Sequence, residues 1–158
     1  MDRAQGADQV AGVLQSYADR GVFRGLKCER ASGGRHMFTF TWLMRRPMTL
    51  GADPSSSVLT FKELLPCVDS KSMMVAELKA LVEGRRSRAL PEHKRIDGRR
   101  AHVTCAVWRG AFSLTITGRG RHYEYALRKA LNLVNELFVL LHEKYPDYLI
   151  EHFGLATE

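Results

Sequence analysis

Two neighbouring stretches decide the fold of this chain: AHVTCAVWRGAFSLTITG (residues 101–118) and RHYEYALRKALNLVNELFVLLHEK (residues 121–144). In the first stretch, apolar and polar residues alternate on both sides of Arg109-Gly110, a pattern typical of a β-hairpin. In the second, apolar residues recur every three or four positions, which predicts a long helix that ends before Pro146. The chain therefore joins an antiparallel strand pair to a long helix.

The N-terminal part of the chain repeats this combination. One apolar stripe runs from Val10 to Ala18 and predicts a helix that stops near Gly21. Residues 22–62 then alternate between apolar and polar side chains, with turn sequences at Gly33-Gly34 and Asp53-Pro54-Ser55. This region is expected to form four short strands in an antiparallel meander.

A second helix is predicted between Ser72, a suitable N-cap, and about Gly84. The segment that follows has no regular period, because Pro91 and Gly98 interrupt it, and we expect a loop or an extended connection. The predicted order is α-β-β-β-β-α-β-β-α in a single domain of residues 1–158. The fold class is α+β, with an antiparallel sheet and helices packed on one side.

This element order resembles the type III secretion chaperone-like fold over roughly residues 8–145. Both run through a helix, a strand meander, a helix, a hairpin and a closing helix. The resemblance implies a small non-enzymatic dimer that binds other proteins. Members of that fold are usually acidic, whereas this chain carries a formal net charge of +7.

The composition is typical of a single globular domain and gives no indication of a membrane-spanning segment. A chain of 158 residues that is 45% hydrophobic can bury one ordinary core. No apolar run approaches the length of a membrane span, and the N-terminus lacks the apolar region of a signal peptide. The three scattered cysteines include no CxxC pair, so we expect a cytoplasmic chain whose Cys28 and Cys105 are small core residues.

The sequence contains no motif of an enzyme that we can identify. A nucleophile elbow, a Walker loop, a zinc-protease helix and a deaminase signature are all missing. His142, Glu143 and His152 do not have the spacing of a standard metal site. We therefore predict no catalytic residue, no metal site and no cofactor, and we expect a binding protein rather than an enzyme.

Most of the excess charge lies in one segment, which we call the basic loop (residues 85–100). Seven basic and two acidic side chains give this loop a net charge of +5. Its candidate binding residues are Arg85, Arg86, Arg88, Lys94, Arg95, Arg99 and Arg100. Three interpretations stay open: a solvated connection, a surface for an acidic protein partner, and a surface for nucleic acid.

A second candidate lies between the hairpin and the long helix. The turn Gly118-Arg119-Gly120-Arg121-His122 places Arg119, Arg121 and His122 beside a helix N-terminus, where backbone N–H groups attract anions. Cations at this end of a helix are unfavourable without an anion. The alternative is a plain structural turn that uses glycine for its backbone freedom.

The long helix has more apolar surface than one sheet face requires. Its first row of apolar residues, from Tyr123 to Leu141, suffices to pack on the sheet. A second row consists of Ala126, Ala130, Leu133, Leu137 and Leu140. We expect this row to form a homodimer or partner contact, unless the N-terminal helix or the stretch Tyr148–Phe153 covers it.

These observations support two hypotheses from different classes. The first is a non-catalytic protein-binding or chaperone-like module that forms a homodimer, has no membrane partner and takes an acidic protein as a further partner. The second is a nucleic-acid or phosphate-ligand binding protein that uses its basic surface.

Overall fold

The computed structural model describes residues 3–30, 34–42, 47–120 and 122–153. The elements in chain order are α1 (Arg3–Asp19), β1 (Arg24–Arg30), β2 (His36–Thr41), β3 (Pro47–Asp53), β4 (Val58–Leu65), α2 (Met73–Glu83), the 3₁₀ turn η2 (Gly84–Arg86), β5 (Ala101–Trp108), β6 (Ala111–Gly118), α3 (Tyr123–Lys144) and α4 (Pro146–Phe153). The predicted order is confirmed, and η2 and the C-terminal helix α4 are additions to it.

All six described strands join one antiparallel sheet in the order β1-β2-β3-β4-β6-β5. The β5–β6 hairpin closes at Arg109 and Gly110, whose φ angles are +51° and +75°. Two consecutive positive φ angles produce the primed turn whose twist matches that of paired strands. The predicted hairpin is therefore confirmed, together with its turn.

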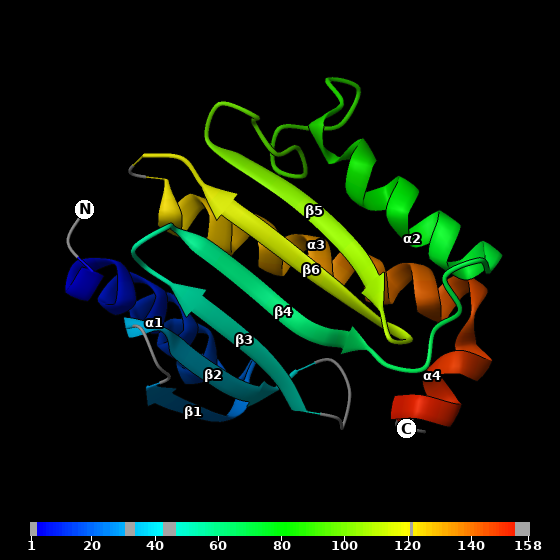
Figure 1. The fold of residues 1–158 in the computed structure, drawn as a ribbon, viewed down its shortest axis with the longest axis horizontal. Helices are drawn as coiled ribbons and strands as arrows, with labels where there is room; N and C mark the ends of the chain where they lie inside the picture. The colour runs from blue at the N-terminus through cyan, green and yellow to red at the C-terminus, as the bar shows by residue number, and fades with distance from the viewer. Residues whose placement is uncertain (1–2, 31–33, 43–46, 121, 154–158) are drawn as a thin grey trace.

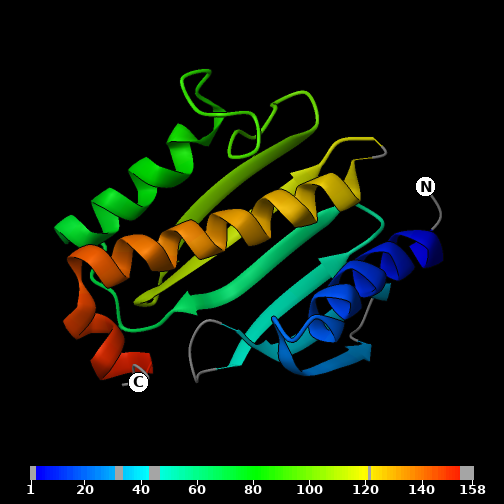
Figure 2. The ribbon, with the colours of Figure 1, turned by 180° about the vertical axis from the view of Figure 1, so that it is seen from behind.

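The helices of the described chain lie on one face of the sheet, as Figures 1 and 2 show from opposite sides. Helix α1 packs against β1 and β3, and α3 lies over β4, β5 and β6. Helix α2 runs beside the edge strand β5 and also contacts α3. The α+β class with one-sided helices is confirmed, and the opposite face of the sheet has no helix on it (Figure 1).

The second apolar row of α3 does not face solvent. Ala126, Ala130, Leu133 and Leu137 have no exposed surface, and Leu140 is partly buried against the core. The expectation that this row is left uncovered is wrong, because α1, α2 and α4 all pack against α3 within the same chain. The row is therefore part of the hydrophobic core of this chain and does not form an exposed apolar patch on α3.

One close contact shapes the start of α3, and a hydrogen bond holds the helix that follows its end. At its start, a Cβ atom on Gly118 would lie only 2.8 Å from the backbone oxygen of His122, so the chain can turn this tightly only with glycine there. At its end, Pro146 begins α4 and the Tyr148 hydroxyl donates a hydrogen bond to the Pro66 carbonyl. The C-terminal helix is thereby tied to the connection between β4 and α2.

Candidate anion-binding site

The basic loop leaves α2 through η2 and returns to the sheet at β5. It contains no strand and no helix beyond η2, as the sequence predicted. Ile96 anchors it: this side chain is 1% exposed, and its backbone N–H donates to the Arg85 carbonyl at 2.8 Å. Burial of this isoleucine, together with its hydrogen bond to Arg85, brings the two halves of the loop together.

Arg85 takes a structural position instead of an exposed one. Its side chain is almost fully buried, with Nη2 3.4 Å from Oε1 of Glu136 on α3. Lys94 Nζ lies 3.0 Å from the same oxygen. The expectation that Arg85 belongs to the exposed surface is wrong, because a buried guanidinium needs a carboxylate and α3 supplies one. The hydrogen bond from Lys94, with help from the Arg85 charge, holds the pKa of Glu136 below its usual range.

Two further side chains of α3 hold the loop. Lys129 Nζ donates to the backbone carbonyls of Glu92 and His93, both at 2.9 Å. The Tyr125 hydroxyl accepts from the backbone N–H of Asp97 at 2.9 Å. Because these contacts use backbone groups of the loop, they fix its course without neutralising its arginines.

The positive potential around the loop reaches Lys129. Burial lowers the pKa of this ammonium group, and the charges of Arg85, Arg100 and Arg95 lower it further, while Glu92 acts in the opposite direction. Burial is thus the main reason that the pKa of Lys129 is lowered, and the three guanidinium groups add to it.

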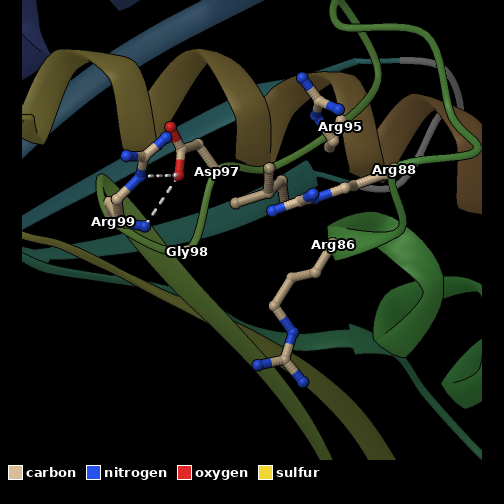
Figure 3. A pocket seen from close by; sticks show the side chains of 7 residues that line it. Arg86, Arg88, Arg95, Asp97, Gly98 and Arg99 are labelled. Carbon is tan, nitrogen blue, oxygen red and sulfur yellow. Dashed lines mark hydrogen bonds and ion pairs between the residues drawn. The ribbon is translucent and has the colours of Figure 1, made fainter.

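The outward side chains of the loop surround one hollow of about 780 Å³. We call it the arginine pocket; Arg86, Arg88, Arg95 and Arg99 line it together with Ile96, Asp97 and Gly98. Figure 3 shows Arg99 against Asp97, while the other three guanidinium groups lie around the hollow away from that carboxylate.

The charges of the arginine pocket are only partly compensated. Asp97 pairs with Arg99 at 3.5 Å and with Arg100 at 3.8 Å, and its pKa is lowered, chiefly by the hydrogen bond from the backbone N–H of Arg99. Within the described part of the chain, Arg86, Arg88 and Arg95 have no acidic partner. Guanidinium groups donate paired hydrogen bonds that match phosphate and carboxylate oxygens, so the pocket suits an anion.

The structure therefore divides the candidate residues of the basic loop. Arg86, Arg88, Arg95 and Arg99 come together, whereas Arg85 and Lys94 serve the ion pair with Glu136. The sequence analysis missed Tyr125, Lys129 and Glu136 as the residues that hold the loop. In the sequence these three polar residues stand four and seven positions apart in a mostly apolar helix. That spacing does not indicate that they contact a loop more than 25 residues earlier in the chain.

The basic turn before α3 lies next to the loop but outside the pocket. Arg119 is exposed, and its backbone N–H donates to the Arg100 carbonyl at 2.8 Å. The His122 ring packs against Tyr125 at a centroid distance of 6.1 Å, and Arg121 lies outside the described residues. The close approach at Gly118 gives this glycine a structural role, and anion binding at the turn stays a prediction.

Cys28 differs from its predicted place, whereas Cys105 packs against the core as predicted. Cys28 is exposed, so its expected place in the core is wrong; β1 is an edge strand that is exposed along most of its length. Its Sγ lies 4.0 Å from Nδ1 of His36. Cys105 is partly buried, and burial raises the pKa of its thiol.

The described ranges contain neither a cluster of metal ligands nor a membrane-spanning helix. There, no group of three or more histidine, cysteine, aspartate or glutamate side chains is arranged to hold a metal ion. Of the helices that the structure describes, not one has both the length and the apolar character needed to cross a membrane.

Comparison of the chain with protein-family models, with curated proteins and with solved structures finds no match.

Proposed function

We propose that this chain is a non-catalytic binding protein that holds a phosphate-bearing polyanion, a nucleic acid or nucleotide, at the arginine pocket. One observation carries the proposal: Arg86, Arg88 and Arg95 surround a single hollow and have no acidic partner in the described chain. Guanidinium groups stay charged at any physiological pH, so three of them in one place repel each other until an anion binds.

The scaffold also favours this function, because the loop is held before any ligand arrives. Glu136, Lys129 and Tyr125 fix its course from the rigid helix α3. A loop whose backbone is already fixed loses less conformational entropy when it binds than a flexible chain does. The pocket is open to solvent and thus suits a ligand whose remaining part extends beyond the protein.

The test is a triple charge reversal, Arg86→Glu with Arg88→Glu and Arg95→Glu. We expect it to abolish retention on heparin and to weaken binding of a labelled single-stranded oligonucleotide. The salt dependence of oligonucleotide binding should flatten, with the slope of log K against log salt falling by about 2 in magnitude for three lost phosphate contacts. Far-ultraviolet circular dichroism checks that the fold persists.

A matched control separates the pocket from net charge. Reversing Arg24, Lys27 and Arg30 on β1 changes the net charge by the same amount, and all three residues are exposed. We expect this control to keep most of the binding. If both variants lose retention equally, the pocket is not the site and only bulk charge attracts the polyanion.

A second arm uses inorganic pyrophosphate and follows backbone amide resonances. Saturable shifts confined to residues 86–99 support a phosphate site in the arginine pocket. Shifts confined to the amides of Arg119 to Tyr123 would place the anion at the basic turn instead. Binding of the oligonucleotide without any pyrophosphate shift would indicate that only a polymer, with its many phosphates, binds.

A second candidate function is a protein-binding or chaperone-like module. Trp108 favours it: this side chain is 70% exposed on the sheet face without helices, and the Arg109 guanidinium lies 4.3 Å from its ring centroid. Tryptophan and arginine are enriched at the energetic centres of protein interfaces. The element order that resembles type III secretion chaperones supports the same role, with a homodimer or an acidic protein as partner.

The salt dependence of binding and the sedimentation of the chain distinguish the polyanion-binding function from the protein-binding function. An apolar interface around Trp108 persists at high ionic strength, whereas phosphate binding weakens steeply. Sedimentation of the wild-type chain beside Trp108→Ala tests the homodimer. A wild-type chain that stays monomeric at high concentration contradicts the dimer and leaves a different protein as the only partner for that face.

A further inference from the structure

No helix covers the other face of the sheet (Figure 1), and residues of neighbouring strands form a row across it. The strand register aligns one residue from each of five strands along this row. From β2 to β5 the residues are Met37, Gly51, Thr60, Thr115 and Thr104. Gly51 is the one position of the row without a side chain, and it lies in an inner strand.

A hollow of about 330 Å³ lies at this position. Its walls include Met37 and Val58, its rim carries Arg35 and Lys62, and Thr60 offers a hydroxyl group. The volume falls at the small end of the range for ligand sites in proteins. None of its lining residues belongs to the arginine pocket, so the two hollows are separate sites.

Neither backbone nor packing requires glycine at residue 51. Its φ angle is not among the positive values that favour glycine. A Cβ atom there would lie 3.4 Å from Met37 Sδ and 3.9 Å from Lys62 Cε, which is ordinary contact. A glycine inside a strand weakens the strand and often marks a place where another molecule approaches the backbone closely. The missing side chain is what leaves the hollow open.

The charges at the rim are positive on balance. Arg35 Nε lies 3.8 Å from Asp53 Oδ2. Hydrogen bonds from Ser55, the largest cause, help to lower the pKa of Asp53, so this carboxylate is ionised and already has its partners. Lys62 is exposed and has no acidic partner in the described part of the chain. One unpaired ammonium beside an apolar wall is complementary to a small organic anion.

We infer that the hollow over Gly51 binds a small organic carboxylate. The carboxylate group pairs with Lys62 Nζ and accepts a hydrogen bond from the Thr60 hydroxyl, while the apolar part of the ligand packs over Gly51 between Met37 and Val58. This site is independent of the proposed polyanion site and does not rely on it.

The experiment titrates the chain with benzoate, and with benzamide as a neutral molecule of the same shape, while backbone amide resonances are followed. We expect saturable shifts at Gly51 and Thr60 with benzoate and much weaker ones with benzamide. Lys62→Gln should lower benzoate affinity about threefold to fivefold, because the lost ion pair is partly exposed. Lys27→Gln, an exposed lysine on β1, is the matched control and should leave the affinity unchanged.

Two variants of the glycine test the geometry. Gly51→Ala adds a methyl group at ordinary contact distance and should weaken benzoate binding; Gly51→Val should abolish it. Amide spectra show whether each variant is folded, and the alanine variant keeps the test valid if the valine variant is not. Absence of saturable shifts in the wild type, or unchanged affinity in Gly51→Ala and Lys62→Gln, overturns the inference. Loss of oligonucleotide binding in the arginine-pocket variant has no bearing on these outcomes.

Discussion

Glu136 Oε1 lies 3.4 Å from Nη2 of the buried Arg85, and this contact joins the central helix to the basic loop. Arg85 is 2% exposed, and Nη2 makes no hydrogen bond in the described chain, so coulombic attraction to Glu136 compensates its charge. Lys94 shares the carboxylate from the solvent side. Removing Glu136 would leave a buried positive charge without a partner, which is among the costlier changes a fold can undergo.

We therefore expect Glu136→Gln to lower the free energy of unfolding by about 2 kcal/mol at neutral pH, less than for a fully buried pair because Glu136 is partly exposed. Denaturant unfolding measures it. Glu124→Gln is the control, because its ion pair with Arg128 is exposed on both sides and its loss should cost well under 1 kcal/mol.

The cost of Glu136→Gln should depend on pH. The pKa of Glu136 is lowered in the folded state from its ordinary value of 4.5, mainly by Lys94. A carboxylate of this kind stabilises the fold above its unfolded pKa, and the contribution disappears as pH falls through the folded pKa. The difference between wild type and variant should thus be full above about pH 5 and shrink in more acidic buffer. A difference that stays constant down to pH 2 contradicts this assignment.

Because the turn before α3 is tight, adding one methyl group at Gly118 should lower the free energy of unfolding strongly. Gly118→Ala would bring Cβ within 2.8 Å of a backbone oxygen, and backbone cannot move aside as a flexible side chain can. We expect a loss of about 2 kcal/mol in unfolding free energy. Gly98→Ala is the matched control: its Cβ meets nothing within 4 Å, and we expect a change within about 0.5 kcal/mol. Equal effects of the two substitutions would show that the close approach is relieved by a small shift.

Because the second apolar row of α3 is buried within the same chain, we expect its residues to contribute to the stability of the fold. Leu133 is fully buried, so Leu133→Ala should cost about 2–5 kcal/mol through lost burial and the cavity left behind. Val139 on the same helix is 40% exposed, and Val139→Ala should cost less than about 1 kcal/mol. Thermal or denaturant unfolding measures both. A small effect at Leu133 would mean that other copies or partners, rather than this chain, cover that row.

The three thiols should react at different rates with a thiol reagent in the native state. Cys28 and Cys67 are exposed, and we expect both to react quickly. Cys105 is partly shielded and burial raises its pKa, so at pH 8 it has less thiolate and should react slowly until the chain is unfolded. The double variant Cys28→Ser, Cys67→Ser isolates the slow thiol. Three equal rates would contradict the described placement.

Local patterns in the sequence were enough to predict the strands and the three longer helices of this fold, but not η2 or α4. Alternation around Arg109-Gly110 and the helical spacing from Tyr123 to Leu141 depend on residues close together in the chain, so each predicts its own element. Short turns between these elements then favour an antiparallel sheet. The element order and the one-sided helices could be predicted for that reason, and so could the irregular course of the basic loop.

The sequence alone determined that this is a basic α+β chain whose excess charge is concentrated in one loop. Only the tertiary structure decided which of those charges are available. Glu136 neutralises Arg85, and the fold buries the second row of α3, because both outcomes depend on which distant residues meet. The hollow over Gly51 likewise exists only once three strands align their register. Charge and period are properties of neighbouring residues, whereas burial and pairing belong to contacts between residues far apart in the chain, which no local pattern records.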